Sequence, residues 1–253
     1  PLWSRGLGDV YKRQVLGTLL SSTGSSVMNN VIESETDKLM DRTKSRVLPT
    51  NKISLVTAKV LGVSFIFIGL FILYYKVNLL TCILSLSTIV LYLFFYTPLK
   101  RKSWLNTSIG AVPGAIPPLG GWTAATNNLE WGGVAVFLIL FFWQHPHFYA
   151  IAYMYKEDYK KAGLQMLPVI DDGVKRTVLH IFLHALILIP ISTLPFFLGV
   201  SGRVYFVGAY ILSNIYMLLC LPFILEQSKE NAELIFRTSI YYFPLLFLSL
   251  IHV

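Results

Sequence analysis

Charge is scarce in this sequence. Charged residues make up 13% of the chain and hydrophobic residues 55%, whereas an ordinary soluble domain carries about a quarter charged residues. The mean hydropathy is correspondingly high, at +0.61. This composition excludes an ordinary soluble domain, so the solvent for most of the surface must be lipid.

Cysteine and the common catalytic motifs are also scarce. Cys82 and Cys220 lie alone inside apolar segments, without the spacing of metal ligands, so we interpret both as small core residues. The sequence contains no G-x-x-x-x-G-K-[ST] loop and no H-E-x-x-H, G-x-S-x-G or dinucleotide-binding glycine pattern. It therefore lacks the signatures of a P-loop nucleotide site, a zinc protease and an α/β-hydrolase.

Long apolar runs, in contrast, are abundant. A membrane-spanning helix needs about 20 apolar residues with few charges. Segments of this kind are residues 54–75, 79–96, 107–125, 131–153, 178–199, 204–225 and 236–252. A shorter run from Val15 to Ile32 ends in a polar helix and predicts a further, truncated span. We therefore predict an all-α, polytopic transmembrane helix bundle of about eight helices.

The beginning of the chain differs from the rest. Residues 1–14 have no apolar period and join the following run without a turn or linker signal. We expect them to be a non-native segment. Residues 15–253 are then expected to form a single transmembrane domain.

Basic residues concentrate in every second connection between the predicted spans. The connections near residues 33–53, 97–106, 154–177 and 226–237 hold Lys38, Arg42, Lys44, Arg46, Lys52, Lys100, Arg101, Lys102, Lys156, Lys160, Lys161, Lys175, Arg176, Lys229 and Arg237. The alternate connections hold Lys76 and Arg203. Because Lys and Arg prefer short cytoplasmic loops, the first set is predicted to face the cytoplasm. The net charge of +8 thus reflects topology and does not indicate nucleic-acid binding.

Acidic residues gather on the same side. All of them except Asp9 and Glu130 fall in these basic connections. The positive-inside rule says little about Asp and Glu, so it does not explain the asymmetry. One membrane face that is rich in both signs favours an enzyme with its active site at that face.

Three polar residues follow one another at intervals of four before the first basic loop. Asn29, Glu33 and Asp37 would stack on one face of a helix, drifting by about 40° per step. One amide and two carboxylates form a hard oxygen site suited to Mg²⁺, which usually binds one or two protein carboxylates together with substrate phosphates. The alternative is a solvated end of an amphipathic helix.

Two groups of cations accompany this motif. Arg42, Lys44 and Arg46 follow it directly and are placed to hold a phosphate group. Residues 100–102 (KRK) form the second group. This second group could anchor the topology, or it could form one anion-binding rim with Arg42 and Arg46.

Residues 143–158 (WQHPHFYAIAYMYKED) carry a second polar constellation. If the helix continues past Pro146, His147 and Asp158 lie about three turns apart and share a face. Lys156 and Asp158 supply a second cation and a second carboxylate, which face the first motif if the two helices meet. A neighbouring column at intervals of four contains His145, Tyr149 and Tyr153.

Four segments together resemble the UbiA-type intramembrane prenyltransferases, and within that family the branch that makes haem O. They are NNVIESETDKLMDRTKSRVLP, YTPLKRKSWLNTSIGAVPGAIPPLGGW, WQHPHFYAIAYMYKEDYKKAGLQMLPV and FRTSIYYFPLLF. The likeness covers nearly everything from Gly17 to Leu250. It implies a helix bundle around a cavity that opens toward the cytoplasm, with the first family helix missing from this chain. Glu33 departs from the family, where Asp is commoner.

The resemblance also implies an activity, the transfer of a farnesyl group from farnesyl diphosphate to a vinyl group of haem b. The expected metal ligands for Mg²⁺ are Asn29, Glu33, Asp37 and Asp158, which with Lys156 form the expected catalytic set. The residues expected to bind the substrates are Arg42, Lys44, Arg46, Lys100, Lys102, Tyr149, Tyr153, His145 and His147. Of the two histidines, His147 is the preferred ligand of the haem iron because it shares a face with Asp158.

The implied location is the cytoplasmic (inner) membrane of a bacterium, with the catalytic side facing the cytoplasm and with an association with haem A synthase. Three alternatives remain open: a prenyltransferase for a quinone precursor or another aromatic acceptor, a membrane transporter, and a structural haem-binding subunit. The His-Pro-His-Phe segment favours haem, because an aromatic acid acceptor has no iron to ligate.

Overall fold

The computed structural model describes residues 2–250, and within that range the regular secondary structure is entirely helical. The long helices are α1 (Leu2–Ile32), α3 (Leu55–Lys76), α4 (Leu79–Val90), α6 (Asn106–Thr126), α7 (Trp131–Met154), α10 (Lys175–Phe197), α11 (Arg203–Leu225) and α12 (Lys229–Leu250). The π-helical segment η1 (Leu91–Tyr96) and α5 (Thr97–Leu99) continue α4. Short helices are α2 (Ser34–Asp37), α8 (Lys156–Lys161) and α9 (Leu167–Ile170). The predicted all-α bundle is confirmed.

Five of these segments are long and apolar enough to cross a membrane by themselves: α3, α4 with its continuation to Leu99, α7, α10 and α11. Two further predicted spans, α6 and α12, are of similar length but less apolar. Pro113, Pro117 and Pro118 lie within α6, and α12 carries charged residues in its first turns. Both helices pack against α7 within the bundle, which removes part of their surface from lipid.

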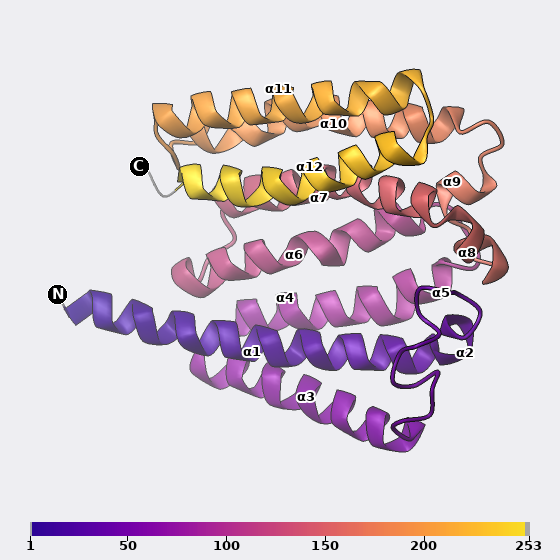
Figure 1. The fold of residues 1–253 in the computed structure, drawn as a ribbon. Coiled ribbons are helices and arrows are strands. Elements are labelled where there is room, and N and C mark those ends of the chain that lie inside the picture. Colours follow the sequence, from indigo (N-terminus) through magenta and orange to yellow (C-terminus); the bar gives the residue numbers. More distant parts are fainter. Residues whose placement is uncertain (1, 251–253) are drawn as a thin grey trace.

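The long helices run side by side, with α2, α5, α8 and α9 gathered at one end of the bundle (Figure 1). The connections after α1, α5, α7 and α11 therefore lie at this end, which we call the polar end. These are the connections in which the sequence concentrates both basic and acidic residues.

Helices α1 and α3 approach one another closely through glycine. A Cβ atom at Gly24 of α1 would lie 2.5 Å from the carbonyl oxygen of Gly62 in α3, and one at Gly69 would lie 2.5 Å from the amide nitrogen of Ser21. Both distances are too short for any side chain. Small residues of this kind allow helix backbones in membranes to pack directly against each other.

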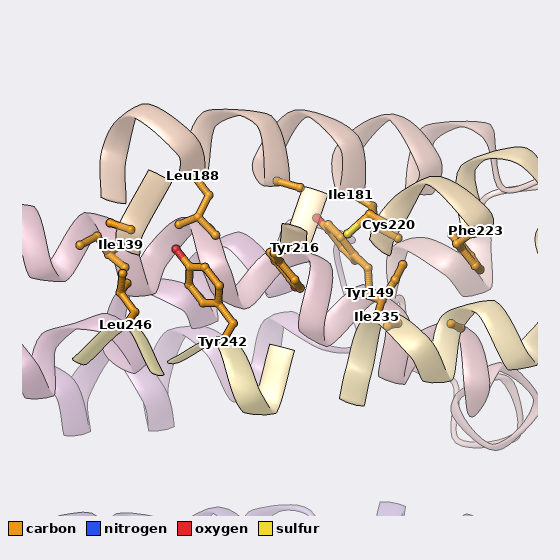
Figure 2. Close-up of a cluster of buried hydrophobic side chains, with 14 of the residues drawn as sticks. Ile139, Tyr149, Ile181, Leu188, Tyr216, Cys220, Phe223, Ile235, Tyr242 and Leu246 are labelled. Carbon is orange, nitrogen blue, oxygen red and sulfur yellow. The ribbon is translucent and has the colours of Figure 1, made fainter. Parts of the chain in front are cut away.

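The other half of the bundle has a closely packed core between α7, α10, α11 and α12. Buried side chains from all four helices meet there, among them Ile139, Leu188, Tyr216 and Leu246 (Figure 2). Some hydroxyl groups in this core bind one another or the backbone, whereas those of Tyr149 and Tyr216 are buried without a hydrogen-bond partner in the described range. A chain of such bonds joins Ser192, Ser213 and Tyr242, with oxygen–oxygen distances of 2.7 and 2.9 Å.

Two local features differ from the expected pattern. Helix α1 begins at Leu2, so residues 2–14, which the sequence sets apart, continue the same helix as the following apolar run. Helix α7 continues past Pro146 as predicted but ends at Met154, and Tyr155 separates it from α8 with φ −109° and ψ 26°. The predicted register of three turns between His147 and Asp158 is therefore wrong.

Candidate functional site

A cavity of about 620 Å³ lies at the polar end of the bundle. We call it the polar cavity. Side chains from α1, from α2 and the loop after it, from η1, from the turn after α5 and from α7 and α8 surround it. Its lining includes Asn29, Asn30, Glu33, Asp37, Arg42, Arg46, Tyr92, Tyr96, Lys100, Phe148 and Tyr159.

The predicted column of Asn29, Glu33 and Asp37 forms part of this lining. Helix α1 ends at Ile32, but the amide nitrogen of Glu33 donates to the Asn29 carbonyl, and that of Asp37 donates to the Glu33 carbonyl, at 2.8 Å each. These bonds keep the helical spacing across the break between α1 and α2. The Asn29 Nδ2 group donates to Glu33 Oε2 at 2.8 Å, while the Thr97 hydroxyl donates to Asn29 Oδ1 at 2.8 Å.

Each carboxylate of the column is paired with a cation that lines the same cavity. Lys100 Nζ lies 2.8 Å from Glu33 Oε1, and both side chains are largely buried, at 13% and 14% exposure. Arg46 Nη1 lies 2.9 Å from Asp37 Oδ2, and the Asp37 side chain is 2% exposed. Removing Lys100 would leave Glu33 as an uncompensated buried charge, which is strongly destabilising, whereas Arg46 is 39% exposed and can be solvated alone. The cavity thus holds both signs of charge in a fixed arrangement.

The second constellation meets the first through Arg42. The backbone N–H of Arg42 donates to Asp158 Oδ2 at 3.2 Å, although 116 residues separate the two in the chain. The Arg42 guanidinium also lies 5.5 Å from the ring centroid of Tyr155. Asp158 and Lys156 themselves line a neighbouring surface hollow of about 430 Å³, and the polar-cavity lining includes neither. The predicted role of Asp158 as a metal ligand stays a prediction.

Two predicted substrate-binding cations lie outside the polar-cavity lining. Lys44 pairs with the exposed Asp41, which Lys161 also contacts at 3.1 Å. Hydrogen bonds from Lys44 and then Lys161 hold the pKa of the Asp41 carboxyl below its usual value. Lys102 is exposed on the turn after α5. Arg42, Arg46 and Lys100 are therefore the cations of the predicted set that face the cavity.

The donor set of the polar cavity suits a metal ion that arrives with its substrate. Within residues 2–250 no group of three or more His, Cys, Asp and Glu side chains is arranged to hold a metal alone. Asn29, Glu33 and Asp37 offer oxygen ligands on one wall, which matches the few carboxylates that Mg²⁺ usually takes from a protein. The remaining ligands would have to come from phosphate oxygens and water.

A second cavity, of about 360 Å³, adjoins the polar cavity and shares Ser26, Tyr92, Tyr96, Phe148 and Met166 with it. We call it the apolar chamber. It extends between α1, α4 and α6 toward the opposite end of the bundle. Many of its lining residues carry hydroxyl groups, but several of these bond to the backbone of their own helix, as Ser22 does to the Leu19 carbonyl and Thr88 to the Leu84 carbonyl. The surface left toward the chamber is mostly apolar.

The sequence interpretation missed two aromatic residues at the junction of the cavities, Tyr92 and Tyr96. Lys100 Nζ lies 4.5 Å from the ring centroid of Tyr96. These three residues recur at intervals of four on one helical segment, and that spacing could have revealed them. Both tyrosines also belong to η1, and π-helical turns occur frequently at functional sites.

The predicted histidines face away from the polar cavity, toward the closely packed half of the bundle. His145 is buried, with Nδ1 2.8 Å from the Phe141 carbonyl and Nε2 3.1 Å from Ser108 Oγ, and its ring stacks on His184 at 3.9 Å between centroids. His147 Nδ1 lies 2.6 Å from Ser239 Oγ of α12. Both nitrogens of His145 are thus engaged, whereas Nε2 of His147 has no hydrogen bond to any residue in the described range.

Tyr149 and Tyr153 also lie outside the polar-cavity lining. Tyr149 is fully buried in the core of Figure 2, and the Tyr153 hydroxyl donates to the Gln227 carbonyl at 2.6 Å, which joins α7 to the turn before α12. The predicted column of His145, Tyr149 and Tyr153 therefore faces α10, α11 and α12. The face of α7 that lines the polar cavity carries Phe148 and Ile151 instead.

Comparison with known proteins identifies the family of this chain. Residues 11–251 match the UbiA prenyltransferase family. The chain is 41% identical over 233 residues to a protoheme IX farnesyltransferase of Solibacter usitatus, which covers 92% of this chain and 80% of that protein.

Solved structures of low identity share the fold. One is a digeranylgeranylglyceryl phosphate synthase, with a TM-score of 0.76 and 19% identity over 96% of this chain and 91% of the other. Another is a UbiA homologue from Archaeoglobus fulgidus bound to GPP and Mg²⁺, with a TM-score of 0.69 and 16% identity over 96% of this chain and 88% of the other. With a family match across nearly its whole length and a relative above 40% identity, this integral membrane protein belongs to the UbiA prenyltransferase family.

Proposed function

We propose that this protein transfers a farnesyl group from farnesyl diphosphate to a vinyl group of protohaem IX, giving haem O. One observation carries the proposal: a cavity lined by paired carboxylates and cations adjoins an elongated apolar chamber. A prenyl diphosphate has a matching division into an anionic head and an apolar tail. The choice of farnesyl and haem rests on the protoheme IX farnesyltransferases among the relatives.

In this proposal the diphosphate lies in the polar cavity. Arg42, Arg46 and Lys100 supply positive charge, and the guanidinium groups suit phosphate oxygens because their donors form a planar fork. Mg²⁺ would bind Glu33, Asp37 and the Asn29 amide oxygen, and when bound it would neutralise negative charge on the departing diphosphate. The GPP and Mg²⁺ bound by the Archaeoglobus fulgidus homologue support this assignment.

Asp158 takes a positioning role in the same proposal. Its carboxylate accepts the backbone N–H of Arg42, and its side chain is 13% exposed, so it holds the loop that carries Arg42 against α8. Lys161 lies 3.9 Å from the other Asp158 oxygen and 3.1 Å from Asp41. The loop after α2 is therefore fastened to α8 at two points beside the cavity.

The reaction begins with cleavage of the bond between farnesyl C1 and its oxygen, and diphosphate leaves with the electron pair. The cations of the polar cavity stabilise that charge where it develops, which is usually the largest catalytic contribution. The rings of Tyr92, Tyr96 and Phe148 at the junction of the two cavities can stabilise the allylic cation. The terminal vinyl carbon of haem then bonds to C1, and water adds to the other vinyl carbon and loses a proton.

For the haem iron we propose His147. Its Nδ1 is held by Ser239 Oγ and its ring stacks on Trp143 at 5.0 Å between centroids, which would leave Nε2 for the iron. A hydrogen bond at the opposite ring nitrogen commonly orients a histidine that binds a metal. His145 is less suited because both its nitrogens already have partners.

The proposal includes a cellular setting. The polar end faces the cytoplasm from the inner membrane of a bacterium, as the distribution of Lys and Arg favours. An association with haem A synthase, which would consume the product, belongs to the same hypothesis.

Product analysis tests the proposed function. Purified protein in detergent would be incubated with Mg²⁺, farnesyl diphosphate and haem b. The porphyrins would then be separated by chromatography and identified by mass spectrometry. We expect a hydroxyethylfarnesyl porphyrin together with stoichiometric diphosphate. A prenylated quinone precursor in a parallel incubation, with unmodified haem, would instead support the aromatic-acid alternative. Movement of substrate across proteoliposomes without any new product would support a transporter.

A further inference from the structure

One glycine of α6 faces unfilled space inside the apolar chamber. Gly120 is buried and belongs to the chamber lining, yet apart from the adjoining residues and backbone of its own helix no heavy atom lies within 4 Å of the position that its Cβ would occupy. Thr107, near the start of α6, lines the same chamber. The helix between Thr107 and Gly120 is about 20 Å long, so Gly120 lies near the chamber end farthest from the polar cavity.

The other glycines of α6 that line the chamber already have their space filled. A Cβ at Gly110 would lie 2.6 Å from the ring of Tyr96, and one at Gly114 would lie 2.1 Å from Gln144 Oε1. The missing side chains of these two glycines leave room for Tyr96 and Gln144. Gly120 differs, because the volume that a side chain would take there is part of the cavity itself.

We propose that Gly120 is a specificity-determining residue that sets the longest prenyl chain the apolar chamber accepts. The inference rests on the proposed function, since it assumes that the tail of a prenyl diphosphate fills the chamber. With the diphosphate held by Arg42, Arg46 and Lys100, each further isoprenoid unit extends toward Gly120. A side chain at this position would occupy the place of the last unit of a farnesyl tail, while the shorter geranyl tail would still fit.

The adjacent Gly121 offers a matched control. It lies on the same helix, its Cβ would have Gln14 Nε2 as its nearest neighbour at an ordinary 3.8 Å, and the chamber lining does not include it. Neither glycine has a positive φ angle, so alanine and leucine are compatible with the backbone at both positions. Both substitutions replace glycine by a better helix former, which favours folding.

Binding measurements test the inference without requiring the transfer reaction. Non-hydrolysable thiodiphosphates of geranyl and farnesyl would be titrated into the purified wild type, Gly120→Ala, Gly120→Leu and Gly121→Leu in the presence of Mg²⁺. We expect Gly120→Leu to weaken farnesyl binding at least tenfold and geranyl binding less than twofold, with a smaller loss for Gly120→Ala. Gly121→Leu should change neither.

Two results would overturn the inference: an unchanged ratio of farnesyl to geranyl affinity in Gly120→Leu, or an equal change of that ratio in Gly121→Leu. Thermal unfolding of each variant in detergent identifies a misfolded protein, and Gly120→Ala then supplies the test. If the wild type binds both compounds but transfers no prenyl group to haem, the proposed acceptor is wrong. The binding measurements would still test the role of Gly120.

Discussion

The two faces of helix α7 look onto very different halves of the bundle. On one side, Gln144, Phe148 and Ile151 border the two cavities, together with α1, η1 and α6. On the other side, His145 stacks on His184 of α10, and Tyr149 lies in the dense core of Figure 2. Both halves contain buried polar groups, but the polar cavity pairs carboxylates with cations, whereas the packed half contains hydroxyl groups and histidine rings.

This difference suggests that the charged groups of the polar cavity serve catalysis, whereas the hydroxyl groups of the packed half stabilise the fold. Burying charge is costly, so buried charges persist where function requires them or where they pair with one another. In the packed half, the hydroxyl groups of Ser192, Ser213 and Tyr242 bind one another and need no charged partner. We therefore expect substitutions at the polar cavity to change catalysis, and also stability where they leave a buried charge unpaired, and substitutions at these hydroxyl groups to change stability alone.

The largest effect is expected from Asp37→Asn. The change keeps the shape of the side chain but removes the charge that we propose to hold Mg²⁺, so kcat should fall on the order of 10³-fold. The fold should persist, because Arg46 is 39% exposed and can be solvated without its partner. Diphosphate release would measure the rate.

The matched control is Asp41→Asn, since Asp41 is an exposed carboxylate on the same loop whose partners are Lys44 and Lys161. Its turnover should stay within about twofold of wild type, because exposed ion pairs contribute little. Equal losses in the two variants would contradict the special role of the cavity carboxylate.

Lys100→Met should produce the next largest effect, this time on stability. The substitution leaves Glu33 buried without its cation, which is expected to lower the free energy of unfolding by about 3 kcal/mol. The double variant Lys100→Met/Glu33→Gln should recover part of the loss. Unfolding in detergent of the two single variants and the double variant gives the coupling energy, and simple additivity would argue against the pair.

A smaller effect is expected from Tyr96→Leu. The Tyr96 ring contacts Lys100, and in our proposal it also stabilises the allylic cation. Without the ring, kcat should fall about tenfold. Tyr96→Phe keeps the aromatic face and should retain most of the activity. If phenylalanine and leucine were equally damaging, the hydroxyl group rather than the ring would be the functional element.

The smallest effect should come from Tyr242→Phe in the packed half. The change removes one hydrogen bond to Ser213, which should cost about 1 kcal/mol of stability. Turnover and substrate affinity should stay at wild-type values. A change in kcat without a change in melting temperature would show that the Tyr242 hydroxyl takes part in the chemistry.

The sequence predicted the helices and the first motif well, because both depend on local spacing. Apolar length places α3, α4, α7, α10 and α11 close to their observed bounds. The interval of four brings Asn29, Glu33 and Asp37 to one cavity wall even though α1 ends between them, since hydrogen bonds bridge the break.

The sequence predicted poorly where the outcome depends on how distant elements meet. The break at Tyr155 turns α8 away from the axis of α7, so the expected register of His147 and Asp158 fails. His145 faces α10 and Phe148 faces the cavity because of the orientation of α7. Both sides of this helix are apolar, so the sequence does not show which side faces the cavity. The proposed role of Gly120 depends on unfilled space in the apolar chamber, which cannot be predicted from the sequence.

The central claim is that the carboxylates of the polar cavity bind the diphosphate through Mg²⁺. The most direct test is the affinity for farnesyl diphosphate, measured by calorimetry with and without Mg²⁺, for the wild type, Asp37→Asn and Asp41→Asn. We expect Mg²⁺ to strengthen binding at least tenfold in the wild type and in Asp41→Asn, and to have almost no effect in Asp37→Asn. Strengthening by Mg²⁺ that survives in Asp37→Asn, or that is absent from the wild type, would contradict the account.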